Sequence, residues 1–347
     1  MHSFVTGIQQ AGIGVQNAEE AAGLYKDLFG MDTLIFDDTS EAPLMTRYTG
    51  GSLHKRRAIL TMNLSGGGGF EIWQFLSRKP SYGKARFGDI GIYALKIKCR
   101  NLEVSFETFS KKKGLTVSDI MQWPNHKKHF WVIDQFGNTF QVVESNDWFR
   151  VTRPNGGVCG AVIGVSDMEN AIIFYRKLLG NASVIYDECI RVNDFNNAAG
   201  ERYRCVLIRK NAAVSGAFCH LLGGVDIELI QSLDGHRPKI YGDRFWGDCG
   251  FMHLCLDVTN MDGLKKMAAE EGYVFSIDSQ DSFGMQDAAG RFCYIEDPDN
   301  TLIELVETHR IPILRALNWY LDLKNRNGNK PLPSWMIRLL GLNKINF

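Results

Sequence analysis

The sequence lacks several features that mark whole classes of protein. No stretch approaches the 18 uninterrupted apolar residues of a membrane-spanning helix, so no membrane span is expected. The 39 basic residues are balanced by 39 acidic ones, which gives no electrostatic reason to expect a nucleic-acid partner. The first residues also lack the basic segment followed by an apolar segment that is typical of a secretory signal. We therefore expect a cytoplasmic protein.

Cysteine pairs of the metal-binding or redox type are missing too. None of the eight cysteines forms a Cys-x-x-Cys pair, and several lie within apolar, strand-like runs such as KIKC and HLCLD. This pattern is typical of reduced, buried cysteines in a cytosolic protein, and it argues against a zinc site made of cysteines. Because 45% of the 347 residues are hydrophobic, the chain can bury a sizeable core as two domains or one double domain.

What the sequence does contain is internal similarity. Residues 12–32 and 162–182 both show a short apolar strand, a polar residue that can cap a helix, and an amphipathic helix that ends in glycine. The two segments lie 150 residues apart. The matching positions are Asn17 and Asp167, Tyr25 and Tyr175, and Gly30 and Gly180.

A second pair of segments follows the same plan. Residues 94–117 and 253–275 each show a strand, an asparagine near the cap, a helix and then a glycine. Short runs rich in β-branched and aromatic residues follow all four helices, which favours strands. The order along the chain is therefore A, B, A′, B′, and each module has the pattern βαβββ.

These modules predict the α+β fold class with a C-terminal helical tail. Modules A and B make up a first half at residues 1–150, and modules A′ and B′ make up a second half at 151–310. The tail covers residues 311–347, where 312–325 and 332–342 are expected to be helical.

A tandem βαβββ unit with the helix ending Tyr-x-x-Leu-(Leu/Phe)-Gly resembles the vicinal-oxygen-chelate superfamily. Residues 297–304, Asp-Pro-Asp-Asn-Thr-Leu-Ile-Glu, are similar to that family's last-strand motif Asp-Pro-x-Gly-x-x-x-Glu. The superfamily includes glyoxalase I, bleomycin-resistance proteins, methylmalonyl-CoA epimerase and extradiol dioxygenases. The resemblance covers residues 6–308 and implies that modules pair into two half-barrel sheets.

The resemblance also implies where metal ligands would lie, one on the first strand and one on the last strand of each module. Glyoxalase-type pairing of A with B′ would bring together a complete glutamine, glutamate, histidine and glutamate set for a divalent metal, with zinc, nickel, cobalt, manganese and iron not distinguished. The aligned positions are Gln10 and Glu71 in A, Ala94 and Gln141 in B, Gly160 and Glu228 in A′, and His253 and Glu304 in B′.

Pairing within each half, as in the dioxygenases, is the alternative. Glu228 would then join His253 and Glu304. Dioxygenases need a second histidine, and Gly160 stands at its place, so iron-dependent ring cleavage is the less favoured reading. The sequence alone leaves the module pairing open.

The chemistry that the resemblance implies is proton transfer through a metal-stabilised enediolate on a small oxygenated substrate, as in an isomerase, lyase or epimerase. Glu304 is the first candidate base and Glu71 the second. The glutathione contacts of glyoxalases are absent, because Gly14, Phe75 and Cys249 stand at their places. A different substrate is therefore expected.

A metal-free protein that sequesters a small molecule, of the bleomycin-resistance type, is the second hypothesis. Trp73, Phe75, Trp123 and Trp131 are candidates to line its binding site. The basic run 55–57 could contact an anionic part of a substrate. In either case the expected partner is a small molecule, and the protein is expected to be a monomer or a homodimer.

Overall fold

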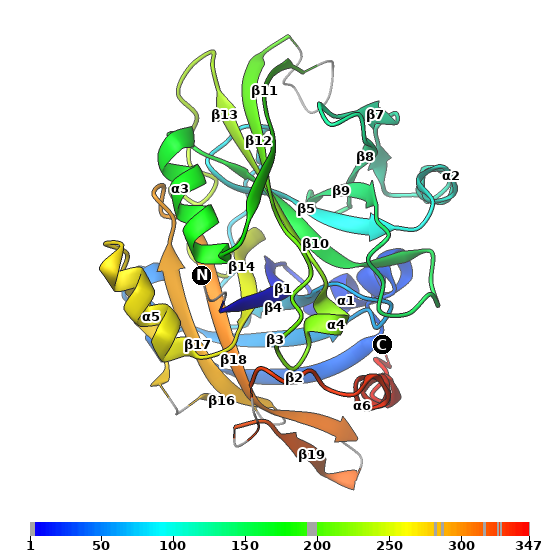
Figure 1. Ribbon diagram of the computed structural model, residues 1–347, viewed down its shortest axis with the longest axis vertical. Coiled ribbons are helices and arrows are strands. Elements are labelled where there is room, and N and C mark those ends of the chain that lie inside the picture. The colour runs from blue at the N-terminus through cyan, green and yellow to red at the C-terminus, as the bar shows by residue number, and fades with distance from the viewer. Residues whose placement is uncertain are drawn as a thin grey trace.

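The computed structural model contains two large mixed sheets, one in the lower and one in the upper part of Figure 1. It describes residues 4–192, 200–280, 283–285, 288–314, 317–324, 326 and 328–346. No helix within these ranges is long and apolar enough to cross a membrane. The predicted α+β class and paired sheets are confirmed.

The first sheet combines modules A and B′, in the order β15-β17-β18-β14-β1-β4-β3-β2. Its central pair, β1 with β14, is antiparallel and joins segments almost 250 residues apart. The strands are β1 (Val5–Gly14), β2 (Thr33–Glu41), β3 (Lys55–Met62), β4 (Gly69–Phe75), β14 (Gly250–Val258), β15 (Phe275–Asp278), β16 (Phe283–Met285), β17 (Ala288–Glu296), β18 (Leu302–Leu314) and β19 (Trp319–Asp322).

The second sheet combines modules B and A′, in the order β11-β12-β13-β10-β5-β9-β8-β6. Each sheet thus takes one module from each half of the chain, and the boundaries predicted at residues 150 and 310 stay a prediction. The strands are β5 (Gly91–Cys99), β6 (Thr116–Val117), β7 (Met121–Gln122), β8 (Lys128–Ile133), β9 (Thr139–Glu144), β10 (Asn155–Gly164), β11 (Ser183–Arg191), β12 (Arg202–Lys210) and β13 (Val225–Ser232).

A helix follows the first strand of every module. These helices are α1 (Ala18–Phe29), α2 (Leu102–Ser110), α3 (Met168–Leu179) and α5 (Met261–Glu270). The predicted caps form: the Asn17 side chain accepts hydrogen bonds from two backbone N–H groups, and Asp167 accepts one from Asn170. Gly30 is left-handed with φ 66°, whereas Gly180 has a positive φ of 57° but an extended ψ of 144°.

The core is divided by the two sheets. The largest cluster of buried side chains packs the four helices against the sheets and against each other. Two smaller clusters lie on the opposite faces: one around Trp73, Trp246 and Tyr294 on the first sheet, the other around Trp131 and Tyr203 on the second. We call these opposite faces the first and the second concave face.

A buried tyrosine and a buried aspartate tie the modules of each half together. The Tyr175 hydroxyl of α3 donates to Asp297 at 2.9 Å, in the turn between β17 and β18, and Tyr25 of α1 donates to Asp134 at 2.8 Å. Asp297 also accepts backbone N–H bonds from Asp299 and Thr301. The aspartate of the Asp-Pro motif therefore anchors a helix and lies outside the ligand set.

The C-terminal segment is only partly helical. The short helix α6 (Ser334–Leu339) and the 3-10 turn η4 (Leu340–Leu342) confirm the prediction for residues 332–342. The helix expected over residues 312–325 is wrong for the described part of that range, because β18 continues to Leu314 and pairs with β19; residues 315, 316 and 325 lie outside the described residues. A short apolar run fits a strand as well as a helix, and here pairing with a neighbouring strand decides.

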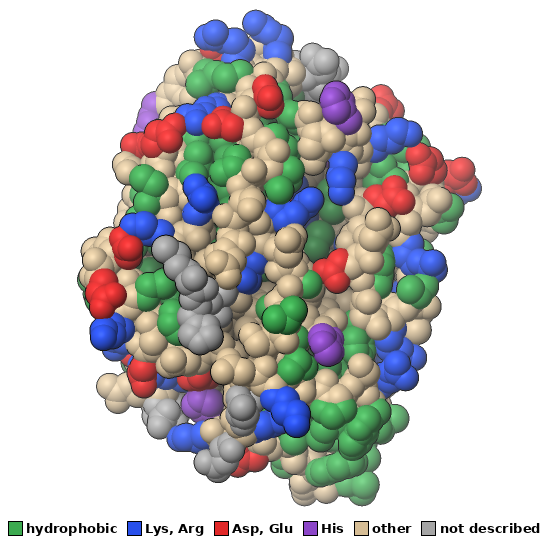
Figure 2. All heavy atoms as spheres, in the orientation of Figure 1, with side chains coloured by type: hydrophobic (Ala, Val, Ile, Leu, Met, Phe, Trp, Pro, Cys, Tyr) green, Lys and Arg blue, Asp and Glu red, His purple; other side chains and the backbone are tan. Residues whose placement is uncertain are grey.

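Hydrophobic side chains gather at the lower end of the face drawn in Figure 2. Trp319 of β19 and Trp335 of α6 are 47% and 57% exposed.

Removing the hydroxyl in Tyr175→Phe is expected to cost about 1–3 kcal/mol of unfolding free energy, because Asp297 loses a buried donor. Burial raises the pKa of Asp297 to about 6, while its hydrogen bonds lower it. Folding therefore favours the protonated acid, and its contribution to stability is lost as the pH rises through about 6. The loss in Tyr175→Phe should accordingly be larger at pH 8 than at pH 4.

Urea unfolding at both pH values measures this effect, with the exposed Tyr82 in Tyr82→Phe as a control. An equal, small loss in both variants at both pH values would contradict the assignment.

Candidate metal centre

Four adjacent strands of the first sheet bring four predicted ligands together. Gln10 lies on β1, Glu71 on β4, His253 on β14 and Glu304 on β18, and these strands are neighbours in the order β18-β14-β1-β4. All four residues are at most 7% exposed. The pairing of A with B′, which the sequence left open, is thus the one that the fold adopts.

The strand register explains why the side chains converge. In module A, Glu71 lies opposite Gly12, two residues after Gln10. In module B′, Glu304 lies opposite the residue two places after His253. Residues two apart on a strand share a face, so each module sends its first-strand and its last-strand ligand to the concave face.

The distances describe one compact cluster. His253 Nε2 lies 3.1 Å from Glu304 Oε2 and 3.3 Å from Glu71 Oε2. Gln10 Nε2 lies 3.4 Å from the same Glu71 oxygen and 3.5 Å from the same Glu304 oxygen. One ligand atom from each of the histidine and the two glutamates lies within 4.8 Å of the others.

Two aromatic residues hold the imidazole of His253 from its other side. The Tyr294 hydroxyl lies 3.2 Å from His253 Nδ1, and Trp246 Nε1 lies 3.4 Å from the same atom. The Trp246 ring is also nearly parallel to the imidazole. Sequence reasoning missed both residues. The signal for Tyr294 was its place in β17, directly opposite Glu304.

Burial and charge act in opposite directions on His253. Burial lowers the pKa of the imidazole, but the charge and contacts of Glu304 and Glu71 outweigh it and raise this pKa to about 9. Without another cation, the imidazolium therefore sits between two buried carboxylates. One positive charge against two negative charges leaves the cluster short of a cation.

The donor set fits a divalent metal. Two carboxylates, one imidazole and one amide oxygen are ligand types that first-row divalent metals accept. Gln10 Oε1, the amide oxygen that would serve as a ligand, is buried and has no hydrogen-bond partner among the described residues. Gly12 makes room for the imidazole, since a Cβ there would lie 2.3 Å from His253 Cε1.

The cluster forms part of the floor of a cavity of about 540 Å³. Gln10, Glu71 and Glu304 reach this cavity, and most of its remaining lining is apolar. Such a volume is typical of a site for a small molecule. The aromatic side chains that line it are Phe36, Trp73, Phe218, Trp246, Phe292 and Tyr294.

The roof of the cavity comes from three other parts of the chain. The short helix α4 (Cys219–Leu222) of module A′ contributes Leu221, and the 3-10 turn η1 (Pro43–Tyr48) contributes Met45. Leu340 of the C-terminal segment completes it. Sequence reasoning missed these residues, because they are ordinary apolar residues in short helices and turns.

The second sheet carries the other four aligned positions, and they form no comparable set. Ala94 and Gly160 lack ligand atoms, so only Gln141 and Glu228 remain. Glu228 lies on the second sheet and does not approach His253. The alternative set of Glu228, His253 and Glu304, which pairing within each half required, is therefore wrong.

The ammonium group of Lys96 contacts both Gln141 and Glu228, the two aligned residues of the second sheet that have ligand atoms. Lys96 Nζ donates to Glu228 Oε2 at 2.5 Å and also to Gln141 Oε1. Tyr186 donates to the other oxygen of Glu228 at 2.5 Å. Gly160 gives the lysine its room, since a Cβ there would lie 2.8 Å from Lys96 Cδ. The ammonium thus balances the buried glutamate on the second concave face.

Other predicted lining residues divide between the two faces. Trp73 lines the cavity, whereas Trp131 belongs to the buried cluster of the second concave face and Trp123 packs against it. Phe75 packs against the His54 ring on the first sheet.

Comparison with known proteins agrees with this architecture. A family model described as the Glyoxalase/Bleomycin resistance protein/Dioxygenase superfamily matches residues 161–294. The resemblance to the vicinal-oxygen-chelate superfamily is confirmed. A search of curated proteins gave no match.

Solved structures of the superfamily share the fold over most of the chain. A candidate dioxygenase from Bacillus subtilis has a TM-score of 0.56 at 13% identity, covering 88% of this chain and 86% of its own. Glyoxalase I from Zea mays has a TM-score of 0.51 at 14% identity, covering 87% and 92%, and a mutant form of it reaches 0.55 with 87% and 93%. At this identity the likeness shows the fold alone.

Replacing the buried lysine in Lys96→Met is expected to cost about 3–5 kcal/mol of unfolding free energy, because Glu228 is fully buried and would lose its cation. The double variant Lys96→Met/Glu228→Gln should recover most of this loss. Urea unfolding measures both. Lys98→Met is the matched control, since Lys98 is also buried on β5 but donates to a backbone carbonyl. A loss no greater than that of the control would refute the role of Lys96.

Proposed function

We propose that the protein is a glyoxalase-like, metal-dependent enzyme that moves a proton next to a carbonyl group of a small oxygenated substrate. The observation that carries the proposal is the convergence of Gln10, Glu71, His253 and Glu304 in one cluster, in which all but His253 line a largely apolar cavity. The resemblance supplies the class of reaction, since glyoxalase I shares the fold and the same ligand types were aligned from the sequence.

In this proposal the four side chains hold one divalent ion: zinc, nickel, cobalt, manganese or iron. The metal would act as a Lewis acid that polarises two neighbouring oxygens of the substrate. Tyr294 would fix the ring of His253, since its hydroxyl can accept the Nδ1 proton when Nε2 serves as the ligand.

The two glutamates are the candidate bases, with Glu304 first and Glu71 second. Both line the cavity, and their Oε2 atoms lie 3.4 and 3.5 Å from Gln10 Nε2. A base must lie within hydrogen-bond reach of the proton that it removes, and a substrate bound beside either carboxylate would meet this need. One carboxylate could take the proton and the other return it, which fits an isomerase, a lyase or an epimerase.

A metal-free binding protein of the bleomycin-resistance type is the second candidate. The apolar lining of the cavity favours it, because such a lining can hold an apolar molecule without any chemistry. The charge deficit of the buried carboxylates favours the metalloenzyme instead. The cysteine pattern supports a cytoplasmic protein. In this proposal it acts on a small molecule, as a monomer or a homodimer.

Metal titration tests the ligand assignment. The purified protein should bind one divalent ion per chain, and His253→Ala and Glu304→Ala should each lose it, because each removes a ligand. Calorimetric titration with zinc or nickel measures the stoichiometry. His129→Ala is the control, since His129 is a buried histidine of the second sheet. Unchanged stoichiometry in both ligand variants would sink the assignment, and absence of metal from the wild-type protein would favour the binding protein.

Gly12→Ala tests the same site without removing a ligand. The added methyl group would lie 2.3 Å from His253 Cε1 and should displace the imidazole. The metal affinity is expected to fall about 10–100-fold, as it does when groups that orient a ligand are lost. Gly23→Ala on α1 is the control, because nothing lies within 4 Å of its added Cβ. Equal affinity in the two variants would show that the position of the imidazole does not matter.

A further inference from the structure

A buried arginine presents an unused edge to the cavity. Arg56 on β3 lines the cavity, and its side chain is only 4% exposed. Its Nη1 donates to the carboxylate of Asp38 at 2.6 Å and to the Asp38 carbonyl at 3.2 Å. Among the described residues, its Nε has no hydrogen-bond partner. Its Nε is therefore a buried donor without a partner, on a side chain that lines the cavity.

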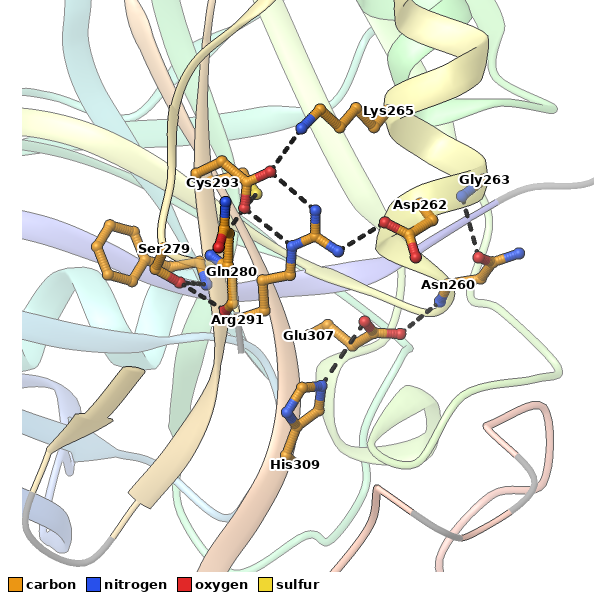
Figure 3. Close-up of polar contacts among 12 residues, drawn as sticks. Asn260, Asp262, Gly263, Lys265, Ser279, Gln280, Arg291, Cys293, Glu307 and His309 are labelled. Carbon is orange, nitrogen blue, oxygen red and sulfur yellow. Dashed lines mark hydrogen bonds and ion pairs between the residues drawn. The ribbon is translucent and has the colours of Figure 1, made fainter. Parts of the chain in front are cut away.

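In two other arginines, Nε and Nη2 both donate to a carboxylate. Arg57, the next residue, donates from Nε and Nη2 to the two carboxylate oxygens of Asp37 at 2.9 and 2.7 Å. Arg291 donates in the same way to Asp278 and from Nη1 to Asp262, as Figure 3 shows for Arg291 and Asp262. Arg56 keeps its charge partner on Nη1 but has nothing on Nε.

Packing fixes the direction of this edge. The guanidinium carbon of Arg56 lies 4.6 Å from the centre of the Trp73 ring, over its face. Trp73 in turn packs against Trp246, with ring centres 4.3 Å apart. Because both tryptophans line the cavity, the guanidinium is held in place as part of the cavity wall.

Arg56 and the candidate metal ligands lie at different points along the strands of the first sheet. On β3, Leu60 is opposite Glu71, and Arg56 is four residues further along, opposite Phe75. Four residues of strand span about 13 Å. The cavity lining between the two ends includes Leu60 and Trp73. A ligand that reaches both ends must therefore be apolar in the middle.

We propose that the cavity takes an amphipathic acid, with a carboxylate bound by the Nε edge of Arg56 and an apolar body lying across Trp73. The oxygenated end that reacts would then lie at Glu71 and Glu304, and this clause rests on the proposed function. Arginine has five N–H donors, so one guanidinium can serve Asp38 and a ligand carboxylate together. The binding of the ligand carboxylate, in contrast, rests on Arg56 alone and needs no metal.

The experiment uses metal-free protein and two probes, decanoate and decanol. With no metal present, the buried pair of Glu71 and Glu304 repels a carboxylate, so the acid group has only the Arg56 end to occupy. Calorimetry should show decanoate binding at least about tenfold more tightly than decanol, as expected for a charge-assisted pair.

Arg56→Lys keeps a cation beside Asp38 but removes the planar edge. It should bring the affinity for decanoate down to that for decanol and leave decanol binding unchanged. Arg57→Lys is the matched control, because the guanidinium of Arg57 is already filled by Asp37 and Glu19, and it should bind both probes as the wild type does. Thermal unfolding of each variant checks that the fold is kept.

Three results would overturn the proposal: equal affinities of the wild type for the two probes, unchanged decanoate binding in Arg56→Lys, or no binding of either probe. Because no metal is present, none of these results bears on the ligand assignment. Failure of the metal titration, conversely, would leave the result with decanoate intact.

Discussion

The antiparallel pairing of β1 with β14 is the contact on which the rest of the molecule depends. It joins the first module to the fourth, and it places Gly12 opposite His253. Were each half to pair within itself, Gln10 and Glu71 would lie in a different sheet from His253 and Glu304. The same exchange pairs β5 with β10 and creates the second sheet. The candidate ligands near the start of the chain therefore meet those near its other end only because β1 pairs with β14.

Both concave faces bury glutamate carboxylates, whose negative charge needs a nearby positive charge. On the second face Lys96 supplies a permanent cation to Glu228. On the first face His253 alone faces two glutamates, which raise the pKa of its imidazole to about 9 against the effect of burial. One face thus balances its carboxylate with a lysine, whereas the other has a single imidazole for two carboxylates. At the positions of Gln10 and His253 in the first sheet, the second sheet has Gly160 and Ala94, which carry no ligand atom.

Much of the site could be predicted from sequence because the strand period of two is strict. Once the repeat was aligned, Gln10, Glu71, His253 and Glu304 fell on one face, and the register of the strands agrees. The open question was pairing, since a local pattern says nothing about which module lies beside which. The fold class was accessible for the same reason, because capped helices and strand runs are local features.

The parts that escaped prediction depend on three-dimensional neighbours. Lys96 looked like an ordinary lysine in a strand, and only the missing side chain at Gly160 gives it space at the centre of the second sheet. Arg56 belongs to the basic run 55–57, whose side chains could all have faced solvent. Only the structure shows that Nε of Arg56 has no partner among the described residues, whereas Nε of Arg57 donates to Asp37. The strand at residues 319–322 was mistaken for helix because its partner, β18, extends further than its motif indicates.

The roof of the cavity has a consequence for how the protein is made. Its parts come from η1, from α4 and from Leu340, so they span nearly the whole chain from the first module onward. During synthesis the ribosome releases Gln10 and Glu71 long before His253, Glu304 and Leu340. A nascent chain can therefore neither gather the four side chains nor complete the cavity until residue 340 has emerged, so the candidate site forms only after segments some 330 residues apart have all been synthesised.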